Sequence, residues 1–143
     1  MRRWFAIGMG LLTIGTAVAG AERLTVSVPN ANIRSGPGTQ YEILWQVEKY
    51  HPLMITKKTG AWYLFQDFEG DTGWVHKSLV AKIPSAITAK SKANVRSGPG
   101  MSFKISFTVG KGIPFRILKQ KDNWLQVEHA DGDRGWIHKG LIW

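Results

Sequence analysis

Residues that could carry out catalysis are scarce in this chain of 143 residues. The chain contains no cysteine, which excludes a thiol nucleophile and also excludes disulfide bonds. Ser35 and Ser97 each lie directly before a Gly-Pro-Gly turn, without the strand-to-helix elbow that exposes the serine of a hydrolase. The sequence therefore offers no nucleophile in a setting that would activate it.

Carboxylates gather at two places, around Gly70 and around Gly132. The residues are Asp67, Glu69 and Asp71 in the first group and Asp131 and Asp133 in the second. A glycine flanked by acidic residues is typical of a hairpin turn. We therefore interpret these carboxylates as solvated turn residues and not as the acid and base of a glycosidase.

The four histidines do not have the spacing of metal ligands. His76 and His138 are 62 residues apart, whereas His51 and His129 have no counterpart at that distance along the chain. We expect His76 and His138 to end a strand and to form local hydrogen bonds. The chain is predicted to be neither an enzyme nor a metal-binding protein, and no cofactor is expected.

Aromatic side chains provide a better basis for function, because they can bind a ligand. The candidates for a binding groove are Trp62, Trp74, Trp124 and Trp136, together with Tyr41 and Phe103. Such rings can stack on sugar rings or on an extended peptide. The alternative is that the four tryptophans cap the fold at a sheet edge, and one indole can serve both roles.

The first 21 residues are typical of a secretory signal peptide. Met1-Arg2-Arg3 is a positive start, Trp4 to Ala19 is apolar, and small residues follow. The apolar stretch is at or below the roughly 18–20 residues of a membrane span, so a membrane anchor is the less favoured alternative. We expect cleavage near Ala19 to Ala21, no stable transmembrane span afterwards, and a periplasmic or secreted protein.

Charge is distributed unevenly along the chain, whose formal net charge is +9. Residues 22–83 contain seven basic and six acidic residues, whereas residues 84–143 contain ten and four. A concentration of positive charge favours contact with anionic polymers. For an exported protein these are peptidoglycan and other anionic envelope polymers, and nucleic acid is not expected. The predicted basic contact surface consists of Lys111, Arg116, Lys119, Lys121 and Lys139, and the alternative is an ordinary solvated surface.

The chain is an internal duplication. A shift of 62 positions aligns residues 32–81 with residues 94–143 without a gap, and 20 of the 50 aligned pairs are identical. A repeat of this length indicates a whole small domain copied in tandem. We predict a signal peptide at residues 1–21, a first domain at residues 22–83 and a second domain at residues 84–143.

Both copies alternate between apolar and variable positions with a period of two, which predicts half-buried strands. In residues 43–47 and 105–109 the first, third and fifth positions stay apolar, so we expect Ile43 and Ile105 to face inward. Residues 53–55 and 63–65 follow the same pattern. Short strands broken by turn residues indicate a small all-β barrel, with one helical turn at residues 77–79 and another at residues 139–141.

The outward positions of the first copy are more apolar than those of the second. Leu44, Met54, Leu64 and Phe68 align with Ser106, Arg116, Gln126 and Ala130. Exposed apolar patches usually mark a contact. We therefore predict a partner patch on the first domain alone, which packs against the second domain or against a partner protein.

The segment NIRSGPG at residues 32–38 returns as NVRSGPG at residues 94–100. We expect Ile33 and Val95 to be the last inward residues of a first strand. The following Ser-Gly-Pro-Gly predicts a type II turn with a positive φ at Gly38 and at Gly100. We expect Arg34 and Arg96 to donate to carbonyl groups of the loop that follows.

The order of motifs resembles that of bacterial SH3-like (SH3b) domains. These motifs are the Asn-apolar-Arg-Ser-Gly-Pro-Gly start, a tryptophan at position 62 or 124, and a closing Gly-Trp-apolar-His followed by Leu79 or Leu141. The resemblance occurs once in each copy and together covers residues 22–143. It implies two tandem SH3-like barrels of five to six strands. It also implies a role in holding cell-wall enzymes on peptidoglycan or in binding peptides.

From these observations we expect an exported, non-catalytic binding protein that acts at the cell envelope and recognises peptidoglycan or its peptide stems. The alternative is an adaptor that docks a periplasmic or secreted protein. Because the 143 residues contain no recognisable wall hydrolase, any enzyme that the protein targets is expected to be a separate chain.

Overall fold

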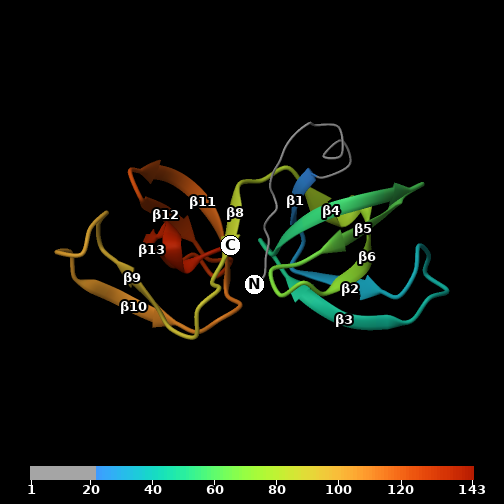
Figure 1. Cartoon of the computed structure of the whole chain (residues 1–143), viewed down its shortest axis with the longest axis horizontal. Helices are drawn as coiled ribbons and strands as arrows, with labels where there is room; N and C mark the ends of the chain where they lie inside the picture. Colours follow the sequence, from blue (N-terminus) through green and yellow to red (C-terminus); the bar gives the residue numbers. More distant parts are fainter. Residues whose placement is uncertain (1–21) are drawn as a thin grey trace.

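The structure, a computed structural model, describes residues 22–143, and the predicted signal peptide lies outside them. The described chain forms two β-sheets, each curled into a small unit, with the two units side by side (Figure 1). No helix within residues 22–143 has the length and apolar character required to cross a membrane. The all-β fold class of two tandem small barrels is thus confirmed.

The first unit is a seven-stranded sheet with the strand order β3-β2-β6-β5-β4-β1-β7. Its strands are β1 (Glu22–Val26), β2 (Asn30–Arg34), β3 (Ile43–Glu48), β4 (Pro52–Thr59), β5 (Trp62–Gln66), β6 (Thr72–His76) and β7 (Val80–Ala81). The sequence predicted that Ile33 lies in the first strand of the unit. It lies in the second, β2, because β1 precedes it. β1 was missed because it lies outside the segment that repeats.

The second unit is a six-stranded sheet with the order β10-β9-β13-β12-β11-β8. Its strands are β8 (Ser85–Ile87), β9 (Ala93–Arg96), β10 (Ile105–Val109), β11 (Pro114–Lys121), β12 (Trp124–Glu128) and β13 (Arg134–His138). Apart from β7, the order reproduces that of the first unit, with β8 in the place of β1. The duplication read from the sequence is therefore a duplication of topology.

Each unit has its own apolar core. In the first, Ile33, Leu53, Ile55, Phe65 and Val75 are fully buried. In the second, the fully buried residues include Val95, Phe115, Val127 and Ile137. Each core also requires a glycine. A Cβ on Gly73 would collide with Ile33, and a Cβ on Gly135 would collide with Val95.

The predicted alternation holds along β4, where Leu53 and Ile55 are buried and Met54 between them is half-buried. The prediction for Ile43 and Ile105 is wrong, since 47% of each residue is exposed. The pairing register of β2 with β3 shifts by one residue, because Ile33 pairs with Trp45 but Arg34 pairs with Ile43. The register of β9 with β10 shifts in the same way. Such a bulge inserts one residue and reverses the phase of what precedes it.

The local motifs at the ends of the repeats are confirmed. Residues Lys77–Leu79 and Lys139–Leu141 form 3₁₀ turns. In the first turn the Nδ1 atom of His76 accepts a hydrogen bond from the Ser78 N–H at 3.2 Å. In the second, His138 accepts one from the Gly140 N–H at 2.9 Å. Each histidine therefore ends its strand by capping a turn.

The repeated SGPG turn differs from the prediction. Neither Gly38 nor Gly100 has a positive φ, and the Gly38 N–H donates to the Gly36 carbonyl at 2.9 Å, which is the pattern of a γ-turn centred on the proline. The prediction of a type II turn is therefore wrong. The glycine that this turn requires for space is Gly36, where a Cβ would collide with the ring of Tyr41.

The arginines of this motif behave as expected. The Nη1 atom of Arg34 donates to the carbonyl groups of Thr39 and Tyr41 at 3.1 and 2.9 Å. Arg96 makes the equivalent bonds to Met101 and Phe103 at 3.2 and 2.9 Å. Each arginine therefore fastens the loop between the second and third strands of the repeat.

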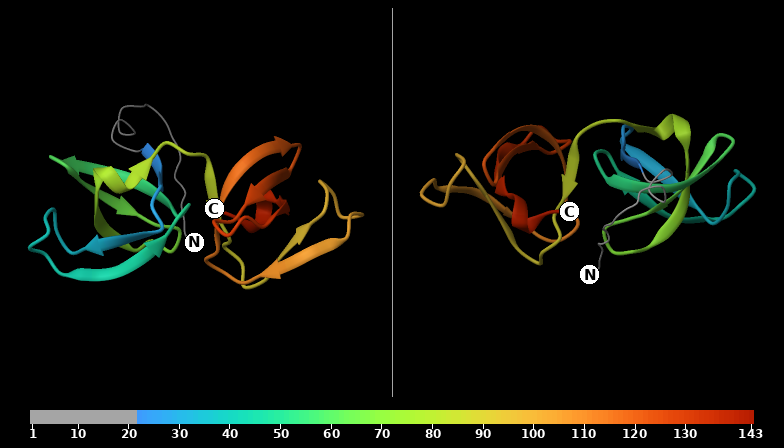
Figure 2. Two further views of the ribbon diagram at one scale, coloured as in Figure 1. Left: turned by 180° about the vertical axis from the view of Figure 1, so that it is seen from behind. Right: turned by 45° about the horizontal axis from the view of Figure 1, so that its top comes forward.

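The chain crosses from the first unit to the second before β8 (Figure 2). Polar contacts join the two units near this crossing. The Thr25 Oγ1 atom lies 2.6 Å from the Ile83 carbonyl and 2.7 Å from the Ser85 Oγ atom. The Arg23 guanidinium donates to the carbonyl groups of Ser85 and Trp143 at 3.1 and 2.9 Å, and it lies 4.4 Å from the centre of the Trp143 ring. Arg23 therefore binds both ends of the second unit.

Candidate ligand-binding surfaces

A row of five outward side chains crosses the sheet of the first unit. Strand pairing places Ile43 opposite Arg34, Arg34 opposite Trp74, Trp74 opposite Leu64, and Leu64 opposite Lys57. Alternation along each strand turns these residues away from the core. The row therefore combines apolar, aromatic and cationic groups on one face.

The second unit repeats this row with a single change of type. The order is Ile105, Arg96, Trp136, Gln126 and Lys119. The Lys119 Nζ atom lies 5.8 Å from the centre of the Trp136 ring, within the range of a cation–π contact. The only difference in kind is Gln126 in place of a leucine.

The other two candidate tryptophans lie beside these rows. Trp62 pairs with His76 and Trp124 pairs with His138, and the rings meet edge to face at 5.1 and 5.3 Å. All four candidate tryptophans are half-buried on β5, β6, β12 and β13 and do not belong to either buried cluster of the described residues. The sheet-edge interpretation is wrong, because these strands lie in the interior of each sheet.

The last two candidate aromatic residues lie on the loops fastened by the arginines. Tyr41 is 40% exposed and Phe103 is 44% exposed. Each ring packs over a glycine, and a Cβ on Gly98 would collide with Phe103 as one on Gly36 would with Tyr41. Each loop is tied to an arginine of β2 or β9, and these strands lie next to β6 and β13, which carry Trp74 and Trp136. Their role in ligand binding stays a prediction.

The predicted basic residues do not form one free patch. Lys111 forms an ion pair with Glu69 of the first unit at 3.0 Å. Arg116 forms one with Glu128, and its guanidinium lies 5.9 Å from the centre of the Tyr50 ring in the first unit. Lys119 faces Trp136, as described. Among the described residues, no ion pair is formed by Lys121 or Lys139.

The predicted partner patch is split among three places. Met54 and Leu64 lie on the neighbouring strands β4 and β5. Leu44 is the bulged residue of β3, with β2 and β6 between it and β5. Phe68 lies near the second unit, where a Cβ on Gly112 would contact its Cζ atom at 3.6 Å.

The expectation that only the first domain exposes apolar residues is wrong. Both units expose large apolar side chains around the loop that follows the repeated turn. The exposed residues are Tyr41, Ile43 and Leu44 in the first unit and Met101, Phe103 and Ile105 in the second. Aligning the two copies could not reveal these exposed residues. The alignment assumed an uninterrupted alternation of inward and outward residues, and the bulges in β3 and β10 reverse that alternation.

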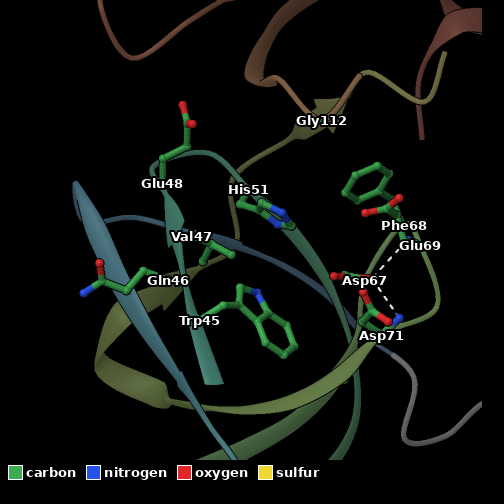
Figure 3. Close-up of a pocket in the computed structure, with 10 residues that line it drawn as sticks. All are labelled: Trp45, Gln46, Val47, Glu48, His51, Asp67, Phe68, Glu69, Asp71 and Gly112. Atoms are coloured by element: carbon green, nitrogen blue, oxygen red, sulfur yellow. Dashed lines mark hydrogen bonds between the residues drawn. The ribbon is translucent and has the colours of Figure 1, made fainter. Parts of the chain in front are cut away.

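A pocket of about 320 Å³ lies at the end of the first unit that faces the second. Figure 3 shows its lining, which is Trp45, Gln46, Val47, Glu48, His51, Asp67, Phe68, Glu69, Asp71 and Gly112. All of these except Gly112 come from the first unit. This site was not predicted from the sequence. Four of its residues differ in kind from their counterparts in the second copy, namely Glu48, His51, Asp67 and Phe68.

The interpretation of Asp67 as a solvated turn residue is wrong, because only 8% of it is exposed. Its Oδ1 atom accepts hydrogen bonds from the N–H groups of Glu69 and Asp71 at 3.0 and 2.9 Å, which turns the carboxylate inward. Burial raises the pKa of Asp67, and the two N–H groups oppose that rise. The turn thus holds a carboxylate inside the pocket.

His51 is equally buried, with 8% exposed. Its Nδ1 atom lies 3.2 Å from the Pro52 carbonyl, which can only accept, so Nδ1 carries the proton and Nε2 is an acceptor. Burial lowers the pKa of His51 to about 4, and the charge of Arg23 acts in the same direction. The ring is therefore neutral at neutral pH.

The fold and the two outward rows define a tandem pair of SH3-like domains. Residues 27–82 and 89–143 match the family described as the bacterial SH3 domain, and the chain belongs to this family.

Related proteins are considerably longer than this chain. It is 26% identical over 141 residues to the putative N-acetylmuramoyl-L-alanine amidase YrvJ of Bacillus subtilis, a match that covers 91% of this chain and 27% of that protein. It is 31% identical over 52 residues to the probable cell wall amidase LytH of Staphylococcus epidermidis, covering 36% of this chain and 18% of that protein. The solved structure of NlpC1 from Trichomonas vaginalis aligns with 94% of this chain and 51% of its own, at 14% identity and a TM-score of 0.41.

Proposed function

We propose that this protein is an exported, non-catalytic binding protein of the bacterial cell envelope that recognises peptidoglycan or its peptide stems. The observation that carries the proposal is the outward row that both units repeat. Half-buried tryptophans outside the core offer flat apolar faces, and the neighbouring arginine and lysine offer donors to carboxylates. Membership in the bacterial SH3 family and the relatives named as cell wall amidases support the same function.

The absence of an activated nucleophile supports a binding role. Among residues 22–143 no group of three histidine, cysteine, aspartate or glutamate side chains could hold a metal ion. His76 and His138 are engaged as turn caps. We propose that the described domains bind and that any bond cleavage requires a catalytic domain beyond them.

Retention on purified sacculi in a salt series tests this function. We expect the protein to stay bound at about 0.3 M salt, where screening has weakened exposed charge pairs. The variant Trp74→Ala/Trp136→Ala should lose most retention while its circular dichroism is unchanged. Thr72→Ala, an outward residue beside the first row, serves as the control. Retention that is absent at every salt concentration, or equal in the tryptophan variant and the control, contradicts the proposal.

The exposed loops favour a second candidate function, an adaptor that docks a periplasmic or secreted protein. Apolar side chains such as Met101, which is 73% exposed, are suited to a protein contact. The same sacculus experiment separates the two functions, because an adaptor would not be retained. For an adaptor, substituting Met101 and Leu44 by serine should weaken capture of the partner. For a wall-binding protein, the same variant should be retained on sacculi as strongly as the unaltered protein.

A further inference from the structure

The pocket between the two units has an unusual set of unsatisfied acceptors. The Asp67 Oδ2 atom and the His51 Nε2 atom have no hydrogen-bond partner among residues 22–143, although each residue is more than nine-tenths buried. Figure 3 places both side chains against the same pocket. Buried polar atoms are nearly always paired, so these two atoms point to a donor that a ligand supplies.

The charge of the pocket favours a cation. Glu48 and Glu69 also line it. Lys111 pairs with Glu69 at 3.0 Å, and the His129 ring, which carries a charge only when protonated, lies 3.1 Å from Glu48. Asp67 and Asp71 have no lysine, arginine or histidine partner among the described residues. The neutral ring of His51 adds a lone pair and no opposing charge. The free groups of the pocket are therefore acceptors with a net negative charge.

The size and walls of the pocket favour an organic cation over a metal ion. No three acidic or histidine side chains among the described residues approach closely enough to hold a metal. The volume of about 320 Å³ lies at the lower end of the range of small-molecule sites. Trp45 and Phe68 line it, and the Phe68 ring meets His51 edge to face at 6.0 Å, so that apolar surface stands beside the acceptors.

We propose that this pocket binds a primary ammonium group on a short apolar stem. The ammonium group donates to a free acceptor of the pocket, Asp67 Oδ2 first, while the negative charge of Asp71 on the same turn attracts it. The stem lies against Trp45 and Phe68. Gly112 of the second unit also lines the pocket, so the second unit contributes one wall residue to it. The inference adds an amine-bearing ligand to the proposed function, but it does not depend on sacculus binding.

The second unit provides an internal control, because it has lost this constellation. Asp67 aligns with His129 and His51 aligns with Ile113, whereas Asp71 is retained as Asp133. Asp133 lies in the equivalent turn of the second unit. There the His129 N–H donates to the Asp133 carbonyl, just as the Asp67 N–H donates to the Asp71 carbonyl in the first unit. The variant Asp133→Asn therefore makes the same change of charge in the same kind of turn without touching the pocket.

Titration of the ¹⁵N-labelled protein with pentylammonium chloride tests the proposal at constant ionic strength. We expect saturable shifts of the Trp45 indole N–H and of the Glu69 and Asp71 amides, with a Kd of about 1 mM for so small a ligand. The uncharged analogue 1-pentanol should bind at least tenfold more weakly. Equal shifts with 1-pentanol, or no saturation by about 20 mM amine, would overturn the proposal.

Two variants localise the binding. Asp71→Asn should weaken pentylammonium binding about tenfold, because it removes one of the two unpaired charges, and Asp133→Asn should leave it unchanged. Asp71 is exposed and its side chain makes no hydrogen bond among the described residues, so this variant is expected to fold. Equal weakening by the two variants would show a general charge effect and contradict the site. Because no sacculi are present, failure here leaves the proposed envelope function standing.

Discussion

The two units share a fold but differ most at the end where they meet. The pocket residues of the first unit and their counterparts in the second are Trp45 and Phe107, His51 and Ile113, Asp67 and His129, and Phe68 and Ala130. The counterparts in the second unit are smaller, apolar or of a different charge type. The end of the first unit therefore forms a pocket, whereas the equivalent end of the second unit lacks the residues that line it and contributes only Gly112 to the pocket of the first.

Elsewhere the units are nearly interchangeable. The arginine that fastens the loop, the histidine that caps the 3₁₀ turn and the tryptophan of the outward row are present in both. Residues needed for the fold or for a shared binding face have been retained twice. The comparison teaches that the copies share the residues of the proposed binding face and differ at their junction.

The largest effect should follow from separating the units. Arg23→Met removes the charged donor to the Ser85 and Trp143 carbonyl groups. Hydrogen bonds from a charged group contribute about 1.5–3 kcal/mol each, so we expect the free energy of unfolding to fall by about 3 kcal/mol. Thermal unfolding followed by calorimetry should then change from one transition to two.

Arg34→Met is the matched control, because Arg34 donates only within its own unit. It should destabilise the first unit and leave the units coupled. If Arg23→Met still unfolds in one transition at an unchanged temperature, the hydrogen bonds of Arg23 do not couple the two units.

Acid should destabilise the first unit selectively through His51, whose counterpart Ile113 does not titrate. Burial lowers the pKa of His51 to about 4, so the unfolded chain binds the proton first as the pH falls. The stabilisation is complete above pH 6.5 and is lost as the pH falls toward 4. Between pH 7 and pH 5 we expect a loss of about 2 kcal/mol, measured by urea unfolding at each pH.

His51→Gln should remove most of this pH dependence. The other shifted carboxyl groups do not obscure the window, because hydrogen bonds and nearby charges lower the pKa of Glu22, of Glu128 and of Asp131 from its ordinary value and so move their titration further below pH 5. Asp67 acts in the opposite direction, since burial raises its pKa. A pH slope that persists in His51→Gln would assign the acid sensitivity to a different group.

Most of the fold was readable from the sequence, because the physical constraints are local or are repeated. Alternation along residues 53–55 identified buried positions, and the Gly-Trp-apolar-His motif marked β6 and β13 and the 3₁₀ turn that follows each. The bulge at Leu44 was not readable, since an inserted residue leaves the apolar pattern intact and changes only which face it points to. The turn at Pro37 was misread because glycine there provides space for the Tyr41 ring and not a positive φ.

The binding surfaces were readable only in part. The tryptophans were identified because large aromatic residues recur at fixed positions in both copies. The pocket was not, because its lining comes from β3, from the turn around Asp67 and from Gly112 of the other unit. The differences at His51 and Asp67 were visible in the aligned copies, but only the three-dimensional arrangement shows that they lie together.

The hairpin between β4 and β5 has a glycine where the equivalent hairpin between β11 and β12 has an aspartate. Gly60 has φ +60°, and its counterpart Asp122 has φ +54°. A non-glycine residue in this region is strained by about 1 kcal/mol. Asp122→Gly should therefore stabilise the second unit by up to about 1 kcal/mol in urea unfolding, and Gly60→Asp should destabilise the first by a similar amount. Changes of the same sign in both variants would contradict this account.

The smallest effect is expected from the exposed ion pair across the junction. Lys111 and Glu69 are about half exposed, so their coupling free energy should be below about 1 kcal/mol. A double-mutant cycle with Lys111→Gln and Glu69→Gln measures it, and about 1 M salt should abolish it. Lys49, the counterpart of Lys111, lies over the Tyr50 ring instead, so Lys49→Gln should show no coupling to Glu69. A coupling as large as the effect of Arg23→Met would instead mean that charge pairs, and not the buried guanidinium, hold the two units together.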